Sequence, residues 1–409
     1  MKVLLINNRH FYDGGTETVY FNTAELLRHA GHEVIFFSFR RDENIKCNQE
    51  QYFVEHKKGI AYLRQYFYNK DAAKQLERLI LEEKPDIAHI HLLWGGLSPS
   101  ILVTLKKYNV PIVHTVHEYR MVCPAYLLKD GNGHQCERCK GGKYYNCFLH
   151  RCSKGSLSES FFMTLEMYYR NWKYHPTTLI DGFIFVSNFT RRKHIEFDNR
   201  FEDVSSVVIY NCPNAIVREA VDIDTDTYSS YYLYYGRLSV EKGVFTLLNA
   251  FSYFPHLKLK VVGSGPLEED LKSFCSEKKL NNIEFLGFKK GRELFDLVAH
   301  AKYVCVPSEC YENNPMTVVE ANSLGIPVIG AGIGGTAEIV KNEVTGFTFE
   351  SGNVKSLLDV ITKSDEIEKE LYQNQKKCAL EFGKENFSRE SHLNKLLDFY
   401  GTFIRKVKT

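Results

Sequence analysis

Two glutamates near the end of the chain, Glu312 and Glu320, lie where a loop is predicted to lead into a helix. The Asn-Asn-Pro run at 313–315 is typical of a turn, and residues 316–324 contain no helix breaker before Gly325. Glu312 therefore belongs to the loop, and Glu320 to about the second helical turn. Because first-turn N–H groups point toward this loop, the pair borders a partly positive helix terminus. Such a site suits a ligand with both hydroxyl and phosphate groups.

Two cations, Arg237 and Lys242, follow a run of β-favouring residues at 231–235 that predicts a strand. Charged residues in a loop are most often simply solvated. At the carboxyl end of the first strand of an α/β domain, however, an Arg and a Lys are placed to bind a diphosphate. The position of this pair favours a phosphate-binding role.

Glycines recur where predicted strands end, which lets backbone N–H groups approach a phosphate or a sugar closely. For Gly14 and Gly15, which follow the first strand, a tight strand-to-helix turn without a ligand is an equally good interpretation. The G-x-G-x-x-G pattern is absent from this first turn, which argues against a nicotinamide or flavin enzyme. The other glycine turns contain Gly263 and Gly265, and Gly334 and Gly335.

Five of the 11 cysteines lie in a glycine-rich segment between residues 123 and 152. A long loop without a core of its own often needs a cross-link, and the spacing of the last four cysteines lies within the range of structural zinc sites. Reduced thiols and a disulfide are the alternatives. The candidate zinc ligands are Cys136, Cys139, Cys147 and Cys152.

Aromatic residues at 161–175 are interspersed with Arg170 and Lys173 in a predicted helix. Such a stretch suits a membrane interface near a lipid-linked acceptor. An aromatic stripe at helical spacing is more often part of a core, and this is the interpretation we favour. The basic run at 191–194 has similar alternatives, a solvated helix face or attraction to a lipid diphosphate.

The composition of the 409 residues is that of an ordinary globular protein, with 44% hydrophobic and 25% charged residues and a net charge of +2. No nucleic-acid partner is expected. No apolar run reaches 18 residues, so no spanning helix is predicted. The start reads as a buried strand rather than a signal peptide, and the cysteine usage fits a reducing compartment. We therefore expect a cytoplasmic protein, with peripheral contact to the inner membrane face as the alternative.

Short apolar runs alternate with helical patterns, which predicts parallel sheets with crossover helices. A polar stretch at 222–227 is the best linker candidate. The first set of predicted strands lies at 3–6, 33–39, 85–91, 111–117, 182–187 and 207–210. The second set lies at 231–235, 257–262, 283–286, 303–306 and 327–329. Two doubly wound α/β domains are expected, with ligands at the carboxyl ends of the strands and in the cleft between the domains.

Four motifs in this order resemble the family-four retaining glycosyltransferases of GT-B fold. They are Gly-Arg-x3-Glu-Lys-Gly from Gly236, Val-Gly-x-Gly-Pro from Val262, Pro-Ser-x3-Glu-x7-Glu-Ala-x3-Gly-x-Pro-Val from Pro307, and Gly-Gly-x2-Glu-Ile from Gly334. The resemblance implies two Rossmann-like domains facing each other across a cleft. It implies an acceptor domain at about 1–212 with the cysteine-rich insert near 123–152, a nucleotide-sugar domain at 213–388, and a C-terminal helix at 389–409 that packs back on the first domain.

The resemblance also implies roles for single residues. Glu320 would bind the donor ribose, and Glu312 would contact the hydroxyls of the transferred sugar near the reacting centre. Arg237 and Lys242 would neutralise the diphosphate, in the absence of an obligatory metal or other cofactor. The remaining donor-binding residues would be Gly15, Gly263, Gly265, Asn314, Met316 and Thr317.

His117 ends the strand at 111–116, and the family places a histidine of a His-Asp pair at this point. By resemblance it would act with Glu312 at the transferred sugar. The neighbour here is Glu118 rather than Asp, so the role of that carboxylate stays open. His114 would point to the opposite face of the strand and be structural. For His89 and His91 we expect structural roles.

The function expected from the resemblance is retaining hexosyl transfer from a UDP- or GDP-sugar to a saccharide or polyprenyl-linked saccharide. Surface polysaccharide or glycoconjugate biosynthesis would be its setting. A sugar-nucleotide epimerase of the same fold is the enzymatic alternative. Outside catalysis, the alternatives are a sugar-binding protein with a degenerate site and a scaffold that recruits assembly proteins through the cysteine segment.

Overall fold

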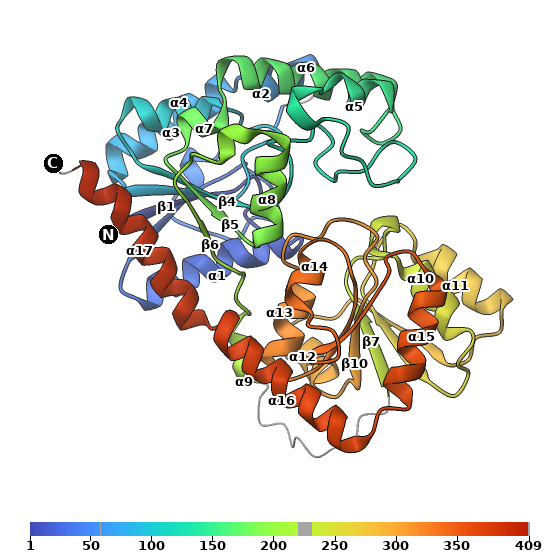
Figure 1. Cartoon of the computed structure of the whole chain (residues 1–409). Helices are drawn as coiled ribbons and strands as arrows, with labels where there is room; N and C mark the ends of the chain where they lie inside the picture. The colour runs from blue at the N-terminus through green and yellow to red at the C-terminus, as the bar shows by residue number, and fades with distance from the viewer. Residues whose placement is uncertain (58, 220–230, 408–409) are drawn as a thin grey trace. The chain divides into compact units, whose positions relative to one another are not determined.

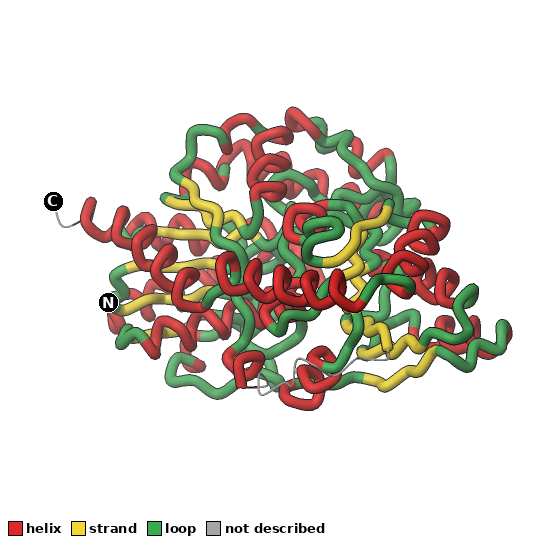
Figure 2. Tube along the Cα trace, turned by 60° about the horizontal axis from the view of Figure 1, so that its bottom comes forward, coloured by secondary structure: helices red, strands yellow, loops and turns green. Residues whose placement is uncertain are grey.

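The computed structural model describes residues 1–57, 59–219 and 231–407, and the polar segment 222–227 lies outside the described residues. The chain forms two compact units, Met1–Ile209 with His392–Thr409, and Tyr210–Ser391. In each unit helices flank a central sheet (Figures 1 and 2). Among the described helices, none combines the length and apolar character needed to cross a membrane.

The first unit contains a six-stranded parallel sheet in the order β2-β1-β3-β4-β5-β6. Nearly all residues of its first five strands are buried, as expected for a parallel sheet covered on both faces. The strands are β1 (Lys2–Ile6), β2 (Glu33–Phe37), β3 (Ile87–Ile90), β4 (Ile112–Val116), β5 (Gly182–Phe185) and β6 (Ser206–Val208).

Helices cover both faces of this sheet, and the last helix of the chain is among them. Residues Leu396, Phe399 and Tyr400 of that helix share a core cluster with Val3 and Leu5 of β1. The helices are α1 (Gly15–His29), α2 (Gly59–Phe67), α3 (Lys70–Glu83), α4 (Ser100–Lys107), α5 (Tyr145–Leu149), α6 (Leu157–Lys173), α7 (Pro176–Leu179), α8 (Asn188–Phe197) and α17 (Arg389–Val407).

The second unit contains another six-stranded parallel sheet, in the order β12-β11-β10-β7-β8-β9. Separate hydrophobic clusters pack on its two faces. The strands are β7 (Tyr231–Tyr235), β8 (Lys258–Val262), β9 (Ile283–Gly287), β10 (Tyr303–Val306), β11 (Val328–Ala331) and β12 (Gly346–Phe349). The helices are α9 (Ala215–Glu219), α10 (Val244–Phe251), α11 (Glu268–Glu277), α12 (Gly291–Ala299), α13 (Met316–Ser323), α14 (Gly334–Ile339), α15 (Val354–Asp365) and α16 (Lys369–Asn386).

The order of the second sheet places a topological switch point between β7 and β10. From β7 the chain adds β8 and β9 on one side, and then crosses to add β10, β11 and β12 on the other. Ligands of doubly wound sheets bind at the carboxyl ends of the strands beside such a point. The loops after β7 and β10 carry the predicted cations and Glu312.

The predicted α/β architecture with two doubly wound sheets is confirmed, because every predicted strand appears within a few residues of its expected position. The strand β12 was not predicted: it is only four residues long and begins with Gly346, whose φ is +138°. The predicted helical C-terminus is α17, a single helix from Arg389.

Candidate functional site

Glycines bring the loops at the carboxyl edge of the second sheet into backbone contact. A Cβ atom on Gly263, after β8, would lie 1.9 Å from the carbonyl oxygen of Gly236, after β7. One on Gly335, at the start of α14, would lie 1.8 Å from the carbonyl oxygen of Asn313. A Cβ on Gly265 would lie 2.3 Å from a carbonyl of the β7 loop. Only glycine permits these approaches, so these residues assemble the edge on which the charged groups sit.

Glu312 and Lys242 form an ion pair at this edge. The Nζ atom of Lys242 lies 2.5 Å from Oε1 of Glu312, and the Ser308 hydroxyl donates to the same oxygen at 2.8 Å. Burial would raise the pKa of Glu312, but the Lys242 charge and these two hydrogen bonds hold it below its usual value. Although burial would lower the pKa of Lys242, the Glu312 charge raises it. Both groups are therefore charged at neutral pH.

Glu320 lies on α13 and is buried, with 7% of the residue exposed. The Tyr235 hydroxyl, at the end of β7, donates to Oε2 of Glu320 at 3.0 Å. Burial raises the pKa of Glu320 to about 7, and the Tyr235 hydrogen bond offsets only part of this rise. Glu320 therefore exchanges a proton near neutral pH. The two glutamates differ in charge because a cation contacts Glu312 whereas a neutral phenol contacts Glu320.

The loop before α13 is fixed by the side chain of Asn314. Its Oδ1 accepts from the backbone N–H of Asn211 at 2.8 Å, and Nδ2 of Asn211 donates to the Asn314 carbonyl at 3.0 Å. Met316 and Thr317 form the first turn of α13, where backbone N–H groups have no carbonyl four residues earlier within the helix. These N–H groups can bind an anion, whereas the Asn314 side chain holds the loop.

Arg237 is exposed in the loop after β7. The Tyr234 hydroxyl donates to the Arg237 carbonyl at 2.7 Å, so the backbone of this loop is fixed while the guanidinium faces solvent. Five donors in a planar fork suit two phosphate groups. Arg237 and Lys242 thus carry positive charge on the loop at the switch point.

In the first unit, His117 follows β4 and stacks on His91, which follows β3. Nε2 of His117 lies 3.0 Å from Nδ1 of His91, and the two rings are parallel within 15°. Burial lowers the pKa of His117 to about 3 and that of His91 well below its usual value, so both rings are neutral. In such a contact one neutral imidazole donates its N–H to the unprotonated nitrogen of the other. We expected only a structural role for His91, but its ring also contacts His117, a predicted site residue.

Two more histidines belong to the same buried cluster. Nδ1 of His89 lies 2.6 Å from the hydroxyl of Tyr400 on α17, and Nε2 lies 2.6 Å from the hydroxyl of Thr115. His114 is buried and its Nδ1 lies 3.0 Å from the Ile90 carbonyl. Both rings thus have structural partners.

Gly15 and Glu118, also in the first unit, differ in their surroundings. Gly15 is the first residue of α1, and Gly14 before it has extended backbone, so neither requires a left-handed conformation. Burial raises the pKa of Glu118, and Arg120 offsets part of this rise. The carboxyl next to His117 therefore lies in an environment that disfavours its charge.

The cysteine segment brings several of its thiols close together. Among residues 1–57, 59–219 and 231–407, no group of three or more His, Cys, Asp or Glu side chains is placed to hold a metal ion. A hydrogen bond with Cys152 and partial burial raise the pKa of the Cys136 thiol. The same hydrogen bond lowers the pKa of Cys152, but a hydrogen bond with Cys147 and burial outweigh it and raise this pKa to about 12. Cys123, Cys136, Cys139, Cys147 and Cys152 of this segment form no disulfide. The zinc site predicted for Cys136, Cys139, Cys147 and Cys152 is not supported by the structure.

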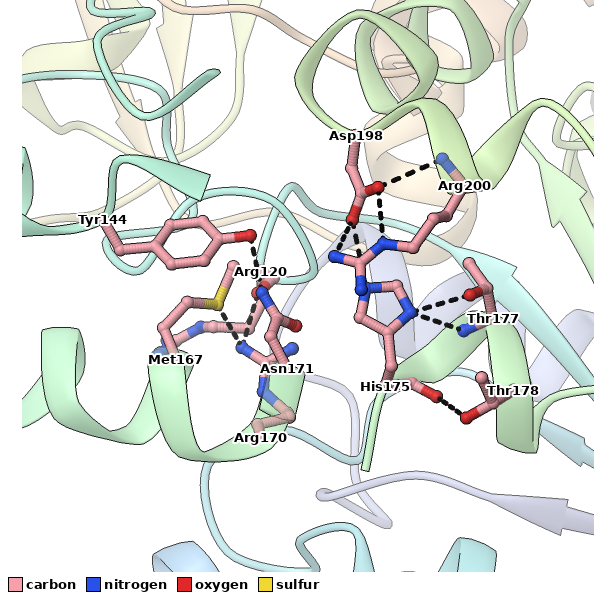
Figure 3. A network of polar contacts seen from close by, with 10 residues as sticks. All are labelled: Arg120, Tyr144, Met167, Arg170, Asn171, His175, Thr177, Thr178, Asp198 and Arg200. Carbon is pink, nitrogen blue, oxygen red and sulfur yellow. Dashed lines mark hydrogen bonds and ion pairs between the residues drawn. The ribbon is translucent and has the colours of Figure 1, made fainter. Parts of the chain in front are cut away.

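A polar network holds the inner face of α6 to the rest of the first unit (Figure 3). Arg170, which is fully buried, donates to Glu166 at 2.8 Å and to the carbonyl of Arg120 at 2.9 Å. Near it, Asp198 accepts from Arg200 at 2.7 Å and lies 3.0 Å from His175. Carboxylates neutralise both cations, so the network fixes the fold rather than a ligand.

The basic run at 191–194 is partly engaged within the protein, because His194 is buried and Lys193 is ion-paired. Lys193 forms ion pairs at 2.8 Å with both Glu137 and Glu196. Its side chain is mostly buried. The prediction that this run attracts a lipid diphosphate receives no support from Lys193.

Three residues of the site were missed from the sequence. Tyr235 contacts Glu320, Ser308 contacts Glu312, and His91 contacts His117. Each stands within two residues of the carboxyl end of a strand, in or next to a loop that carries a predicted site residue. Their position at the carboxyl ends of strands was the sequence feature that could have identified them as site residues.

Comparisons with known proteins agree with this geometry. The Glycosyltransferase Family 4 model matches residues 13–214, and the Glycosyl transferases group 1 model matches residues 219–381. An uncharacterized 42.6 kDa protein in the cps region of Klebsiella pneumoniae is 26% identical over 275 residues, which is 66% of this chain and 64% of that protein. The UDP-Gal:alpha-D-GlcNAc-diphosphoundecaprenol alpha-1,3-galactosyltransferase of Escherichia coli is 28% identical over 31% of this chain and 34% of that enzyme. The chain thus spans less than two thirds of either relative.

Solved structures share the fold along almost the whole chain. A glycosyltransferase from Rickettsia africae has a TM-score of 0.72 at 19% identity, with 98% of both chains covered. Anabaena HepE in complex with UDP-glucose has a TM-score of 0.67 at 17% identity, with 98% of this chain and 100% of that chain covered. Since the two family models together account for most of the sequence and the fold matches throughout, the chain belongs to the family-four, group 1 glycosyltransferases of GT-B fold.

Proposed function

We propose that the protein transfers a hexose from a UDP- or GDP-sugar to a saccharide or a polyprenyl-linked saccharide, with retention of configuration. Surface polysaccharide or glycoconjugate biosynthesis is the proposed setting. The observation that carries the proposal is the ion pair of Lys242 and Glu312 at the switch point, on the same edge as Glu320 and the first turn of α13. The E. coli relative, named for a lipid-linked diphosphate acceptor, and the UDP-glucose complex of HepE support the choice of substrates.

In this proposal, different charged groups bind different parts of the donor. Glu320 accepts hydrogen bonds from the ribose hydroxyls. Lys242, Arg237 and the N–H groups of Met316 and Thr317 bind the diphosphate. Since Lys242 already contacts Glu312, the diphosphate shares this cation with the carboxylate, and Glu312 is drawn close to the sugar bound beside it.

The proposed reaction is a substitution on one face of the sugar. The bond between C1 and the phosphate oxygen breaks as the acceptor oxygen forms its bond to C1 on the same face. The acceptor proton passes to the departing phosphate oxygen, and the nucleoside diphosphate leaves. Fixed cations and a helix terminus stabilise the charge that develops on the leaving group, and each such contact typically lowers the barrier by about 2.7–4 kcal/mol.

The first unit provides the acceptor side in this proposal. His117 and Glu312 would orient the transferred sugar, and Gly15 would lie near its phosphates. His117 is neutral because burial lowers its pKa to about 3, so it would act as a hydrogen-bond donor or acceptor rather than as a cation. No metal or other cofactor is required for these steps.

A thermal-shift titration with UDP-glucose, UDP-galactose, GDP-mannose and the free nucleotides tests the donor assignment. A bound donor at 100 times its dissociation constant should stabilise the protein by about 2.7 kcal/mol. The double variant Arg237→Ala, Lys242→Ala should lose the shift, and Lys369→Ala, which removes an exposed lysine of the same unit, should keep it. Wild-type binding and turnover in the double variant would refute the donor site.

A further inference from the structure

Helix α6 has a buried inner face and an outer face that stays largely exposed, although Phe161 of the outer face contacts Phe148 of α5. Its inner face contains Met163, Met167 and Arg170, all buried. Its outer face is apolar and solvent-exposed, contrary to the core position that we expected for these aromatic residues. The exposed residues are Leu157, Phe161, Leu165, Tyr168 and Trp172.

These five side chains form one continuous stripe. At 3.6 residues per turn their positions fall within an arc of about 80° around the helix axis. The stripe runs along the 17 residues of α6, which corresponds to a length of about 25 Å. Trp172 is 81% exposed and Phe161 50% exposed, which is unusual for aromatic side chains of a folded unit. Tyr145 and Leu149 of the adjoining helix α5 are exposed as well.

The charges around this stripe are mostly positive. Lys143 before α5, Arg151 and Lys154 between α5 and α6, and Lys173 at the end of α6 are exposed. Glu159 is the partly exposed acid of the same stretch, and it lies 3.4 Å from Lys154. The other acid of the helix, Glu166, is buried against Arg170. An apolar stripe with aromatic residues and a cationic border has the chemistry of a helix that lies in the interface of an anionic bilayer.

We propose that the outer face of α5 and α6 binds the surface of an anionic lipid bilayer. The aromatic and leucine side chains enter the region between headgroups and acyl chains, and the exposed cations contact lipid phosphates. The polar contacts of Arg170 hold the helix to the unit from behind, so the stripe can insert without loss of internal packing. The proposal extends the proposed function, because an acceptor with a lipid anchor would be met at this surface.

Vesicle binding of the full chain tests this surface without any sugar substrate. We expect sedimentation with vesicles of phosphatidylglycerol, and at least tenfold weaker binding to vesicles of phosphatidylcholine. The variant Phe161→Ser, Trp172→Ser should lose binding at least tenfold. The matched control Tyr253→Ser, Leu371→Ser removes exposed apolar residues of the second unit and should bind as the wild type does.

Tryptophan fluorescence gives a second readout, because the chain contains two tryptophans and Trp94 is buried. Emission of Trp172 should shift to the blue on anionic vesicles and be quenched by brominated lipid. Equal vesicle binding of the Ser variant, or no spectral shift, would overturn the proposal. So would a change in oligomeric state of the Ser variant without loss of vesicle binding, since the face would then be a contact between copies. Donor-induced thermal shifts in both variants report separately on the proposed function.

A second inference concerns His91 and rests on a different observation. Its Nδ1 is hydrogen-bonded to Nε2 of His117, and in the described part of the chain its Nε2 is buried without a hydrogen-bond partner. If His117 donated in this contact, neutral His91 would carry its own proton on the unpaired Nε2. Because buried N–H groups without a partner are rarer than buried acceptors without one, His91 should be the donor.

We infer that His91 is a positioning residue that fixes His117 with its proton on Nδ1. His117 then presents an N–H to its surroundings at the end of β4, rather than a lone pair. The effect of His91 on catalysis rests on the proposed function. The tautomer of His117 does not, since it can be measured in the protein without substrate.

Nitrogen-15 NMR of histidine-labelled protein distinguishes the two tautomers of His117. We expect a protonated Nδ1 and an unprotonated Nε2 in the wild type. In His91→Leu the preference should disappear and kcat should fall more than tenfold with KM for the donor within twofold. His91→Asn, whose amide nitrogen can replace Nδ1 as donor, should restore most of both. A wild-type His117 protonated on Nε2 would overturn the inference even if the enzyme is active.

Discussion

Lys242 reaches across the switch point of the second sheet to Glu312, with 2.5 Å between Nζ and Oε1. This contact keeps Glu312 ionised despite its burial. Lys242→Met should therefore raise the pKa of Glu312 and lower kcat by about 10²–10³, as for the loss of a fixed donor at a developing charge. Activity measured against pH checks this. Ser308→Ala, which leaves the ion pair in place, should have a smaller effect, and an unchanged rate in Lys242→Met would contradict the proposed clamp.

Donor binding should depend on pH through Glu320. Its pKa of about 7 is that of the protein without ligand, and hydrogen bonds from ribose hydroxyls favour the ionised carboxylate. The dissociation constant of the donor should therefore increase by about tenfold from pH 8 to pH 6. Calorimetric titration at several pH values measures this slope. Glu320→Gln should bind more weakly at pH 8 and show no slope, and a pH-independent wild type would exclude the role given to Glu320.

The same carboxyl makes stability depend on pH in a predictable direction. Burial raises the pKa of Glu320 from 4.5 to about 7, so its contribution to stability is fully present below pH 4.5 and is lost as pH rises through 7. Relative to Glu320→Gln, the wild type should lose up to about 3 kcal/mol of unfolding free energy between pH 4.5 and pH 8. Urea denaturation of both proteins at these pH values tests it. Parallel stability curves would show that Glu320 has an ordinary pKa.

Gly335→Ala should disturb the loop that carries Glu312. The added Cβ would lie 1.8 Å from the carbonyl of Asn313, so the loop must move by more than 1 Å. We expect a loss of about 1–3 kcal/mol of stability and weaker donor binding. Gly401→Ala, whose Cβ would have no atom within 4 Å, is the matched control. Thermal denaturation with and without nucleotide separates the two effects, and equal behaviour of both variants would contradict the packing argument.

Tyr400→Phe should destabilise the first unit. The change leaves Nδ1 of the buried His89 without its partner on α17, which typically costs about 1–3 kcal/mol. Tyr253→Phe, at an exposed position, should be neutral. Chemical denaturation measures the stability of both variants. A neutral Tyr400→Phe would mean that the histidine is satisfied in another way.

Much of the fold was accessible from the sequence, because alternating apolar runs and helices predict parallel sheets. The strand β12 was not, since four residues that begin with glycine give little periodicity. In the site, the positions of Glu312, Glu320 and Lys242 follow from strand ends and turns. Their pairing does not, because Tyr235 and Glu320 are 85 residues apart and meet only through the sheet order. The outer face of α6 was misjudged for a related reason: periodicity locates an apolar face but does not reveal whether anything covers it.

Because α17 belongs to the first unit, the two units complete their folding in a defined order during synthesis. The core of that unit contains Val3 and Leu5 from the beginning of the chain and Leu396, Tyr400 and Phe403 from the last helix. While the ribosome synthesises the second unit, the part of the first unit's core that α17 covers therefore stays exposed to solvent. The second unit, Tyr210–Ser391, is continuous in sequence and can close as soon as it emerges. We therefore expect the first unit, most of which is synthesised first, to complete its folding after the second unit.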